Sequence, residues 1–428
     1  MHTTLRRESG FSLVELLVAV AIGLIGIIIM LQVFENAEGV RRTTVSGGDA
    51  QQNGVIALYS MERDVRNAGM GINEIHLLAP PCNMVGYDGA RNTPNFPTAG
   101  TIVLTPVQIF PGGTPTTPDQ LAVFYGAQTQ ANTVTLVTPV TMTATSNNLT
   151  VTTTFGFRPG DLLLLFQPSL APAAAPQNCI FMEVTRIGDA GPPDTTNQIF
   201  HASSTYTLAN SGASVVARFN PPNFTGPNAA MALTFSGNKL VNDSVTRVYN
   251  LSNIHDAEDF PGTQNPRTPV YNLYTVANNS LNVSNQFVVS GGIASISSIA
   301  DNIVHMRADY GLDDGGTNPP TTGTPGDGVI DRFLDPAAFN ALASPPWQYI
   351  VSIRIAVVAR SALAEKAGPG TKCDGTTTFP TWSGAGSAAR GFDLSGMALP
   401  ANVTAWDCYR YRVFETIVPV RNTIWRSS

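Results

Sequence analysis

The chain has few charged side chains, and they do not cluster. Asp, Glu, Lys and Arg make up only 13% of its 428 residues, and the formal net charge is −6. Because there is no basic cluster, no nucleic-acid partner is expected, and the mildly acidic balance argues against binding to anionic membrane surfaces. With 38 glycines and 31 prolines beside so little charge, the composition is typical of an exported, β-rich protein.

Signatures of catalysis are also missing. The sequence contains no H-E-x-x-H spacing, no phosphate-binding loop and no G-x-S-x-G element. Its five histidines are scattered: His2, His76, His201, His255 and His305. His255 stands among acids in the segment Ile254–Asp259, which is compatible with a metal or catalytic cluster, although an exposed turn is the simpler interpretation. The sequence therefore predicts a protein without enzyme activity.

Proline is absent from the first 79 residues, so no proline ends a helix there. Residues Phe11–Phe34 are almost continuously apolar and about long enough to cross a bilayer, with Glu15 as their only ionisable residue. A helical period returns between Gln51 and Gly69 and places four apolar residues on one face: Leu58, Met61, Val65 and Ala68. We expect one helix from about Phe11 to about Ala68. Residues 11–34 form its membrane half, and residues 35–70 pack on a globular domain.

The residues before the apolar run differ from a secretory signal. Such a signal is cleaved after its apolar stretch at small residues, and Val33–Asn36 offers no such site. Instead, Arg6, Arg7 and the Gly10-Phe11 junction precede the run. This arrangement resembles the class III signal of type IV pilins and type II secretion pseudopilins. The resemblance implies that residues 1–10 are a leader, that a prepilin peptidase cuts after Gly10 and methylates Phe11, and that the helix is retained.

Glu15 lies inside the apolar run. A carboxylate in a membrane segment costs roughly 2.5–3.5 kcal/mol on insertion scales, so it is a functional candidate. The resemblance implies that it meets the new N-terminal amine of a neighbouring subunit's Phe11 and sets the assembly register. In the alternative, the helix is an ordinary signal anchor, and Glu15 extends toward the lipid headgroups.

Two further regions narrow the resemblance. Leu58–Gly71 ends a helix with an acidic-basic turn followed by Ala-Gly, and Asp301–Asp313 contains Tyr310-Gly311-Leu312-Asp313. Together with the terminal strand ending in Arg421-Asn422, these segments resemble PilW-type minor pilins. The resemblance implies a subunit of the inner membrane, single-pass with its globular domain in the periplasm, that is incorporated into a type IV pilus.

PilW-like function implies structural partners. These are other minor pilins, the major pilin, prepilin peptidase, the inner-membrane assembly machinery and a tip adhesin. The implied role is to prime assembly near the filament tip.

Two alternatives remain open. One is a J-type minor pseudopilin of type II secretion. The other is a membrane-anchored periplasmic enzyme or sugar-binding module built on residues 80–300.

After the helix, short runs rich in Val, Thr, Phe and Leu alternate with Pro, Gly and Asn turns, which predicts strands. The fold class is therefore α+β, with a long pilin-like helix followed by a large, mainly antiparallel β region. We expect a β-rich region over residues 71–295 and a C-terminal β region over residues 296–428, divided between Gly291 and Ser298.

Four cysteines allow three pairings. We favour Cys82–Cys179 with Cys373–Cys408, because each bond would join a loop-rich region, as is common in exported proteins. The alternative is four separate buried thiols. No C-x-x-C spacing indicates zinc or redox chemistry.

One acidic, glycine-rich segment is the main candidate for a metal site. Its carboxylates are Asp313, Asp314, Asp327 and Asp331. Several oxygens on a glycine-rich loop suit Ca²⁺, although the regular calcium-loop spacing is missing. The alternative is a solvated turn in which Asp and Gly satisfy turn chemistry. No other cofactor is expected.

Overall fold

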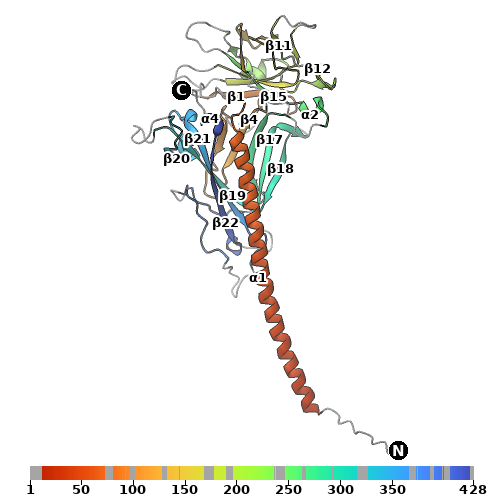
Figure 1. Cartoon of the computed structure of the whole chain (residues 1–428), viewed down its shortest axis with the longest axis vertical. Helices are drawn as coiled ribbons and strands as arrows, with labels where there is room; N and C mark the ends of the chain where they lie inside the picture. Colours follow the sequence, from red (N-terminus) through yellow and green to blue (C-terminus); the bar gives the residue numbers. More distant parts are fainter. Residues whose placement is uncertain are drawn as a thin grey trace, which may run out of the picture.

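The structure of the chain is a computed structural model. It describes residues 12–72, 81–91, 93–96, 102–127, 133–143, 145–167, 178–188, 196–235, 237, 246–262, 267–290, 293–315, 326–365, 373, 375–385, 390–397, 399 and 405–424. A long helix projects from a β-rich globular body, and this confirms the expected α+β class (Figure 1).

Helix α1 spans Leu13–Asn67 without a break. Its start is fixed by a capping box, in which the Ser12 hydroxyl accepts from the Glu15 N–H at 3.3 Å and Glu15 Oε2 accepts from the Ser12 N–H at 3.4 Å. The helix ends at Asn67, and Gly69, two residues later, has a φ of +79°, a left-handed conformation that favours glycine. The helix predicted from about Phe11 to about Ala68 is thus present over its described residues.

Two antiparallel sheets hold the second half of α1. The first has the strand order β18-β17-β16-β4-β3 and the second β20-β19-β21-β22. Their strands are β3 (Val107–Phe110), β4 (Gln120–Tyr125), β16 (Val270–Ala277), β17 (Ser280–Ser290), β18 (Ile293–Asp301), β19 (Ile303–Leu312), β20 (Arg332–Leu334), β21 (Ile350–Arg360) and β22 (Tyr411–Pro419). Met61 and Val65 of α1 share one core with side chains from both sheets.

A second group of strands lies at the end of the body farthest from the start of α1, and we call it the distal unit (residues 81–96 and 133–262) (Figure 1). Its main sheet has the order β2-β1-β9-β8-β15-β5, in which only the β1–β9 pair is parallel. These strands are β1 (Asn83–Asp88), β2 (Thr93–Phe96), β5 (Thr133–Thr135), β8 (Asp161–Phe166), β9 (Asn178–Glu183) and β15 (Arg247–Asn253). Every residue of β8 is buried: one face of the sheet packs within the distal unit, and the other shares a core with β4, β16 and β17 of the five-stranded sheet.

Smaller elements complete the structure. In the distal unit, the sheet β10-β11-β7 and the pairs β12–β13 and β14–β6 involve β6 (Val140–Thr141), β7 (Asn148–Thr150), β10 (Arg186–Ile187), β11 (Gln198–Phe200), β12 (Thr205–Thr207), β13 (Ser214–Val216) and β14 (Thr234–Phe235). Short helices are α2 (Asp256–Asp259), α3 (Pro336–Asn340), α4 (Arg421–Ile424), η2 (Gly226–Met231), η3 (Trp347–Tyr349) and η5 (Trp406–Cys408).

Most of the distal unit is inserted between two neighbouring strands. β4 and β16 pair antiparallel, and Tyr125 at the end of β4 lies opposite Val270 at the start of β16. The chain therefore leaves the two sheets that hold α1 at Tyr125. It returns to them at Val270, beside Tyr125 and 145 positions later (270 − 125). Insertions are tolerated best where the two ends of the inserted segment lie close together.

The division expected between Gly291 and Ser298 falls in the hairpin that joins β17 to β18. These two strands pair from Ser280↔Asp301 to Ser290↔Ile293 and belong to one sheet. The sheet therefore continues across the expected boundary, and the insertion after Tyr125 is the clearer subdivision of the chain.

Both disulfides have the pairing favoured from the sequence. Cys82 is bonded to Cys179, with 5.6 Å between their Cα atoms, and joins the start of β1 to β9. Cys373 is bonded to Cys408, with 4.7 Å between their Cα atoms. All four cysteines of the chain are thus paired.

Candidate functional site: helix α1 and its attachment

The first half of α1 is an apolar helix that no described part of the protein covers. Leu13–Phe34 has a mean hydropathy of 2.9, and none of it is buried. An apolar surface of this length is long enough to cross a bilayer and is rarely left in contact with water. This half of α1 is therefore suited to a membrane, while the other half is fixed in the protein.

Glu15 lies in the first turn of this apolar helix. Its carboxylate is exposed, and its contact with the Ser12 N–H places negative charge where the helix dipole favours it. Gly10 and Phe11, the predicted cleavage and methylation residues, lie outside the described part of the chain. In the sequence Glu15 is four positions after Phe11, and in the structure it lies in the first turn of α1.

Asp64 fixes the second half of α1 to the five-stranded sheet. Only 1% of Asp64 is exposed, and its Oδ2 accepts from the Tyr274 hydroxyl and from Asn272 Nδ2, both at 2.6 Å. The Tyr125 hydroxyl donates to Oδ1 at 3.3 Å. Burial, with the adjacent carboxylate, raises the pKa of both tyrosines, so they remain donors. A carboxylate on the apolar stripe of the predicted helix, three residues after Met61, is the signal that could have revealed this anchor.

Gly54 allows α1 to approach β22 closely. A Cβ atom at this position would lie 2.2 Å from the ring of Phe414, so no larger side chain fits without movement. By contrast, a Cβ at Gly47 or Gly48 would meet nothing within 4 Å. Gly54 is therefore a packing residue, whereas the glycine pair lies on an open face of the helix.

The end of α1 is held by the segments that lead to the distal unit. The Gly69 N–H donates to the Phe124 carbonyl at 2.9 Å, and the Gly126 N–H donates to the Met70 carbonyl at 2.8 Å. Asn422 Nδ2 donates to the Ala68 carbonyl at 2.8 Å. These contacts fix the distal unit beyond the end of α1 that lies away from the apolar half.

The four candidate calcium ligands have partners within the protein. Asp313 is buried, and its carboxylate accepts from the N–H groups of Gly326, Asp327 and Gly328. Asp314 pairs with Arg332, Asp331 accepts from the Gly315 N–H at 2.6 Å, and Asp327 accepts from the Val329 N–H at 2.8 Å. No three of these carboxylates bring oxygens within 4.8 Å of one another. These contacts are those of turn residues, and calcium binding by the segment stays a prediction.

The acids around His255 also pair with protein groups. Asp256 and Asp259 of α2 both contact Arg158, and Asp259 also accepts from Asn210. His255 lies 3.5 Å from the buried carboxylate of Glu183, and this contact helps to raise its pKa against the opposing effect of burial. The cluster joins α2 to neighbouring loops of the distal unit.

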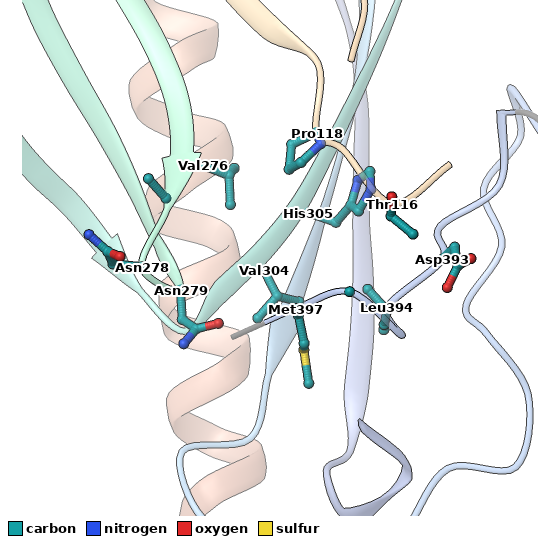
Figure 2. A pocket seen from close by; sticks show the side chains of 12 residues that line it. Thr116, Pro118, Val276, Asn278, Asn279, Val304, His305, Asp393, Leu394 and Met397 are labelled. Carbon is teal, nitrogen blue, oxygen red and sulfur yellow. The ribbon is translucent and has the colours of Figure 1, made fainter. Parts of the chain in front are cut away.

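A pocket of about 130 Å³ lies where the β16–β17 turn meets the loops before β4 and after Phe392 (Figure 2). Val304, Leu394 and Met397 line it together with Asn278. His305 also lines it, but its Nε2 lies 3.0 Å from the Pro115 carbonyl oxygen, and burial lowers its pKa to about 4. The imidazole is therefore neutral and oriented by the backbone, which suits packing better than proton transfer.

Two family comparisons match separate parts of the chain. Residues 270–422 match the family model of type IV pilus-assembly protein W, PilW, and residues 5–31 match the prokaryotic N-terminal methylation motif. The resemblance predicted from the sequence is thus confirmed, and the two matches support a type IV pilus minor pilin. Searches of curated proteins and of solved structures found no match. The PilW match begins at Val270, the first residue after the insertion.

Proposed function

We propose that this chain is a minor pilin that takes part in the initiation of type IV pilus assembly near the filament tip. The observation that carries the proposal is α1, in which a bare apolar half continues without a break into a half packed against two sheets. A helix of this kind can move from a bilayer to the core of a filament, because both surroundings accept an apolar surface.

Prepilin peptidase removes residues 1–10 and methylates Phe11. The methylation-motif match over residues 5–31 supports this processing. Before assembly, α1 anchors the protein in the inner membrane and the globular body lies in the periplasm. The role is structural rather than enzymatic, in keeping with the PilW match.

Glu15 sets the position of a subunit against its neighbour. A lone carboxylate within a bilayer costs roughly 2.5–3.5 kcal/mol, and an amine at the same depth can offset this cost. Cleavage creates such an amine at Phe11 of a neighbouring subunit. Because Glu15 lies in the first turn, only a neighbour at one axial position can bring its amine to this carboxylate.

The body supplies the contacts to other subunits. Its partners are other minor pilins, the major pilin and the inner-membrane assembly machinery, and a tip adhesin at the end of the filament. The distal unit lies beyond the end of α1, so in a subunit whose helix points back toward the membrane it faces the tip (Figure 1). This position supports a role at the start of the filament.

Mass spectrometry of the N-terminal peptide tests the proposal. Sheared filaments and membranes are compared, and methylated Phe11 is expected as the N-terminus in both fractions. A processed terminus found in membranes alone would favour the pseudopilus of type II secretion. An intact terminus that contains Arg6 would refute the pilin assignment.

A further inference from the structure

Strand β18 forms an open edge of the five-stranded sheet. It pairs with β17 on one side, and no other described strand pairs with its second side. Ile293 and Ile296 on this strand are 70% and 67% exposed, and Val288 on β17 is also exposed. An open edge carries unpaired N–H and C=O groups, which are a template for another strand.

The edge lacks two of the features that usually protect an exposed strand. Between Val270 and Ala300 the sequence contains no charged residue and no proline. Soluble proteins normally protect an edge with Lys, Pro, a β-bulge, a covering helix or loop, or an inward charge, because exposed edge strands otherwise associate. The pairing of β18 with β17 is irregular at two places, but no charge or proline guards the exposed isoleucines. These isoleucines therefore point to an interaction surface.

The other edges of the two lower sheets differ from β18. The opposite edge of the same sheet, β3, is largely buried. In the second sheet, the edge strand β22 exposes Arg412 and Glu415, and the other edge strand, β20, begins with Arg332, which pairs with Asp314. The lack of protection is thus a local property of β18 and its hairpin.

The position of β18 indicates what pairs with it. The strand lies along one flank of α1 (Figure 1), and its Ala300 shares a core with Ala57 and Met61 of the helix. A subunit whose own helix packs along α1 brings its globular body to this flank. The segment that docks must be uncharged, since a charge placed against this apolar edge would lose its hydration without a partner.

We propose that the free edge of β18, residues Ile293–Ser298, pairs with an uncharged, extended strand of a neighbouring filament subunit and so continues the five-stranded sheet across the subunit interface. This inference rests on the proposed function, because it requires a neighbour with a parallel helix. It adds a backbone-paired contact between globular bodies to the contact between helices.

Site-specific photo-cross-linking in the full-length protein tests the contact. A benzophenone side chain replaces Ile296 or, as a control, Val216, which is 69% exposed on β13 of the distal unit. We expect position 296 to yield an adduct whose cross-linked peptide is an uncharged, extended segment of a protein that carries an N-terminal methylation motif, and position 216 to yield no such adduct. An adduct to a helix, to a charged loop or to a protein of another class would overturn the inference, as would no adduct at 296.

A charged substitution on the edge should weaken the same contact and provides a second test. Ile296→Lys is expected to lower recovery of the chain in sheared filaments at least tenfold relative to Val216→Lys, at equal membrane level and equal processing of Phe11. Equal recovery of the two variants would contradict the docking role. Mass spectrometry of the N-terminal peptide distinguishes a failure of this inference from a failure of the proposed function. Methylated Phe11 in filaments without the adduct overturns the edge contact alone, whereas an unprocessed terminus overturns the filament assignment as well.

Discussion

Asp64 shows how one polar residue fixes the long helix α1 to the β-rich body. Three side-chain donors converge on a carboxylate that is almost completely buried. Removal of such an acceptor leaves buried donors without a partner, and each unsatisfied group costs about 1–3 kcal/mol. The donors come from β4 and β16, the two strands between which the insertion lies.

Asp64→Ala is expected to lower the free energy of unfolding by about 2–4 kcal/mol, because the hydroxyl of Tyr274 and the amide of Asn272 lose their acceptor. Denaturant unfolding of the full chain in detergent measures the change. Asp49→Ala, an exposed carboxylate on the same helix, is the control and should change stability by less than about 0.5 kcal/mol. Equal effects of the two changes would remove Asp64 from the anchor.

His201 gives the fold a defined response to acid. Burial lowers the pKa of this imidazole to about 4. Below about pH 6.5, His201 is protonated in the unfolded chain, but in the folded protein it stays neutral down to about pH 4. The free energy of unfolding therefore falls as the pH drops between these values. We expect His201 to contribute a loss of roughly 2–3 kcal/mol over this range.

His201→Gln removes this linkage. Unfolding free energies of the wild-type protein and the variant, measured at pH 7 and pH 4.5, should therefore differ in slope, with a shallower decline in the variant. Parallel declines would show that His201 is protonated in the folded state.

Residues of this kind could be found from the sequence only in part. Cys82–Cys179 and Cys373–Cys408 were favoured because few pairings exist and each bond joins a loop-rich region. The roles of Asp64 and His201 depend on strands more than 100 residues away or on burial that no local pattern reports. The acidic segment at Asp313 has the composition of a calcium loop, and its calcium binding stays a prediction; the backbone donors of Gly326 and Gly328 that Asp313 accepts from could not be read from its composition.

At the scale of elements, α1 was the most predictable part of the fold. Its apolar run, its 3.6-residue period and the absence of proline all favour one helix, and α1 continues through Gly47 and Gly48. The pairing of β17 with β18 was not predicted from the sequence. Pairing between strands depends on distant partners, which a single strand's sequence does not reveal.

Gly54→Val tests the close packing of α1 on β22. The new side chain must displace the Phe414 ring, and overpacking of this kind costs about 1–3 kcal/mol. Thermal unfolding of the full chain in detergent should show a lower midpoint for this variant.

The matched control is Gly47→Val on the same helix, where a side chain meets open space. It should leave the midpoint unchanged or raise it slightly, because glycine is the poorer helix former. An unchanged midpoint for Gly54→Val would mean that α1 and β22 are not in close contact.

For the whole molecule, the unexpected feature is the distal unit. The sequence predicted strands across residues 80–300 but not that Tyr125 and Val270 would pair and make most of that region an insertion. The PilW match starts where the insertion ends, so the family comparison and the topology independently mark the same position. The molecule is therefore a helix anchored in a two-sheet body, with an additional β unit at the far end.

Glu15→Ala provides the most direct test of the central claim that α1 enters a filament with Glu15 setting its register. The account predicts normal membrane insertion and normal cleavage before Phe11, but no detectable chain in sheared filaments, because the carboxylate no longer meets a neighbour's amine. Glu38→Ala, which changes a carboxylate on α1 outside the apolar span, should enter filaments at the wild-type level. Wild-type incorporation of Glu15→Ala would contradict the account.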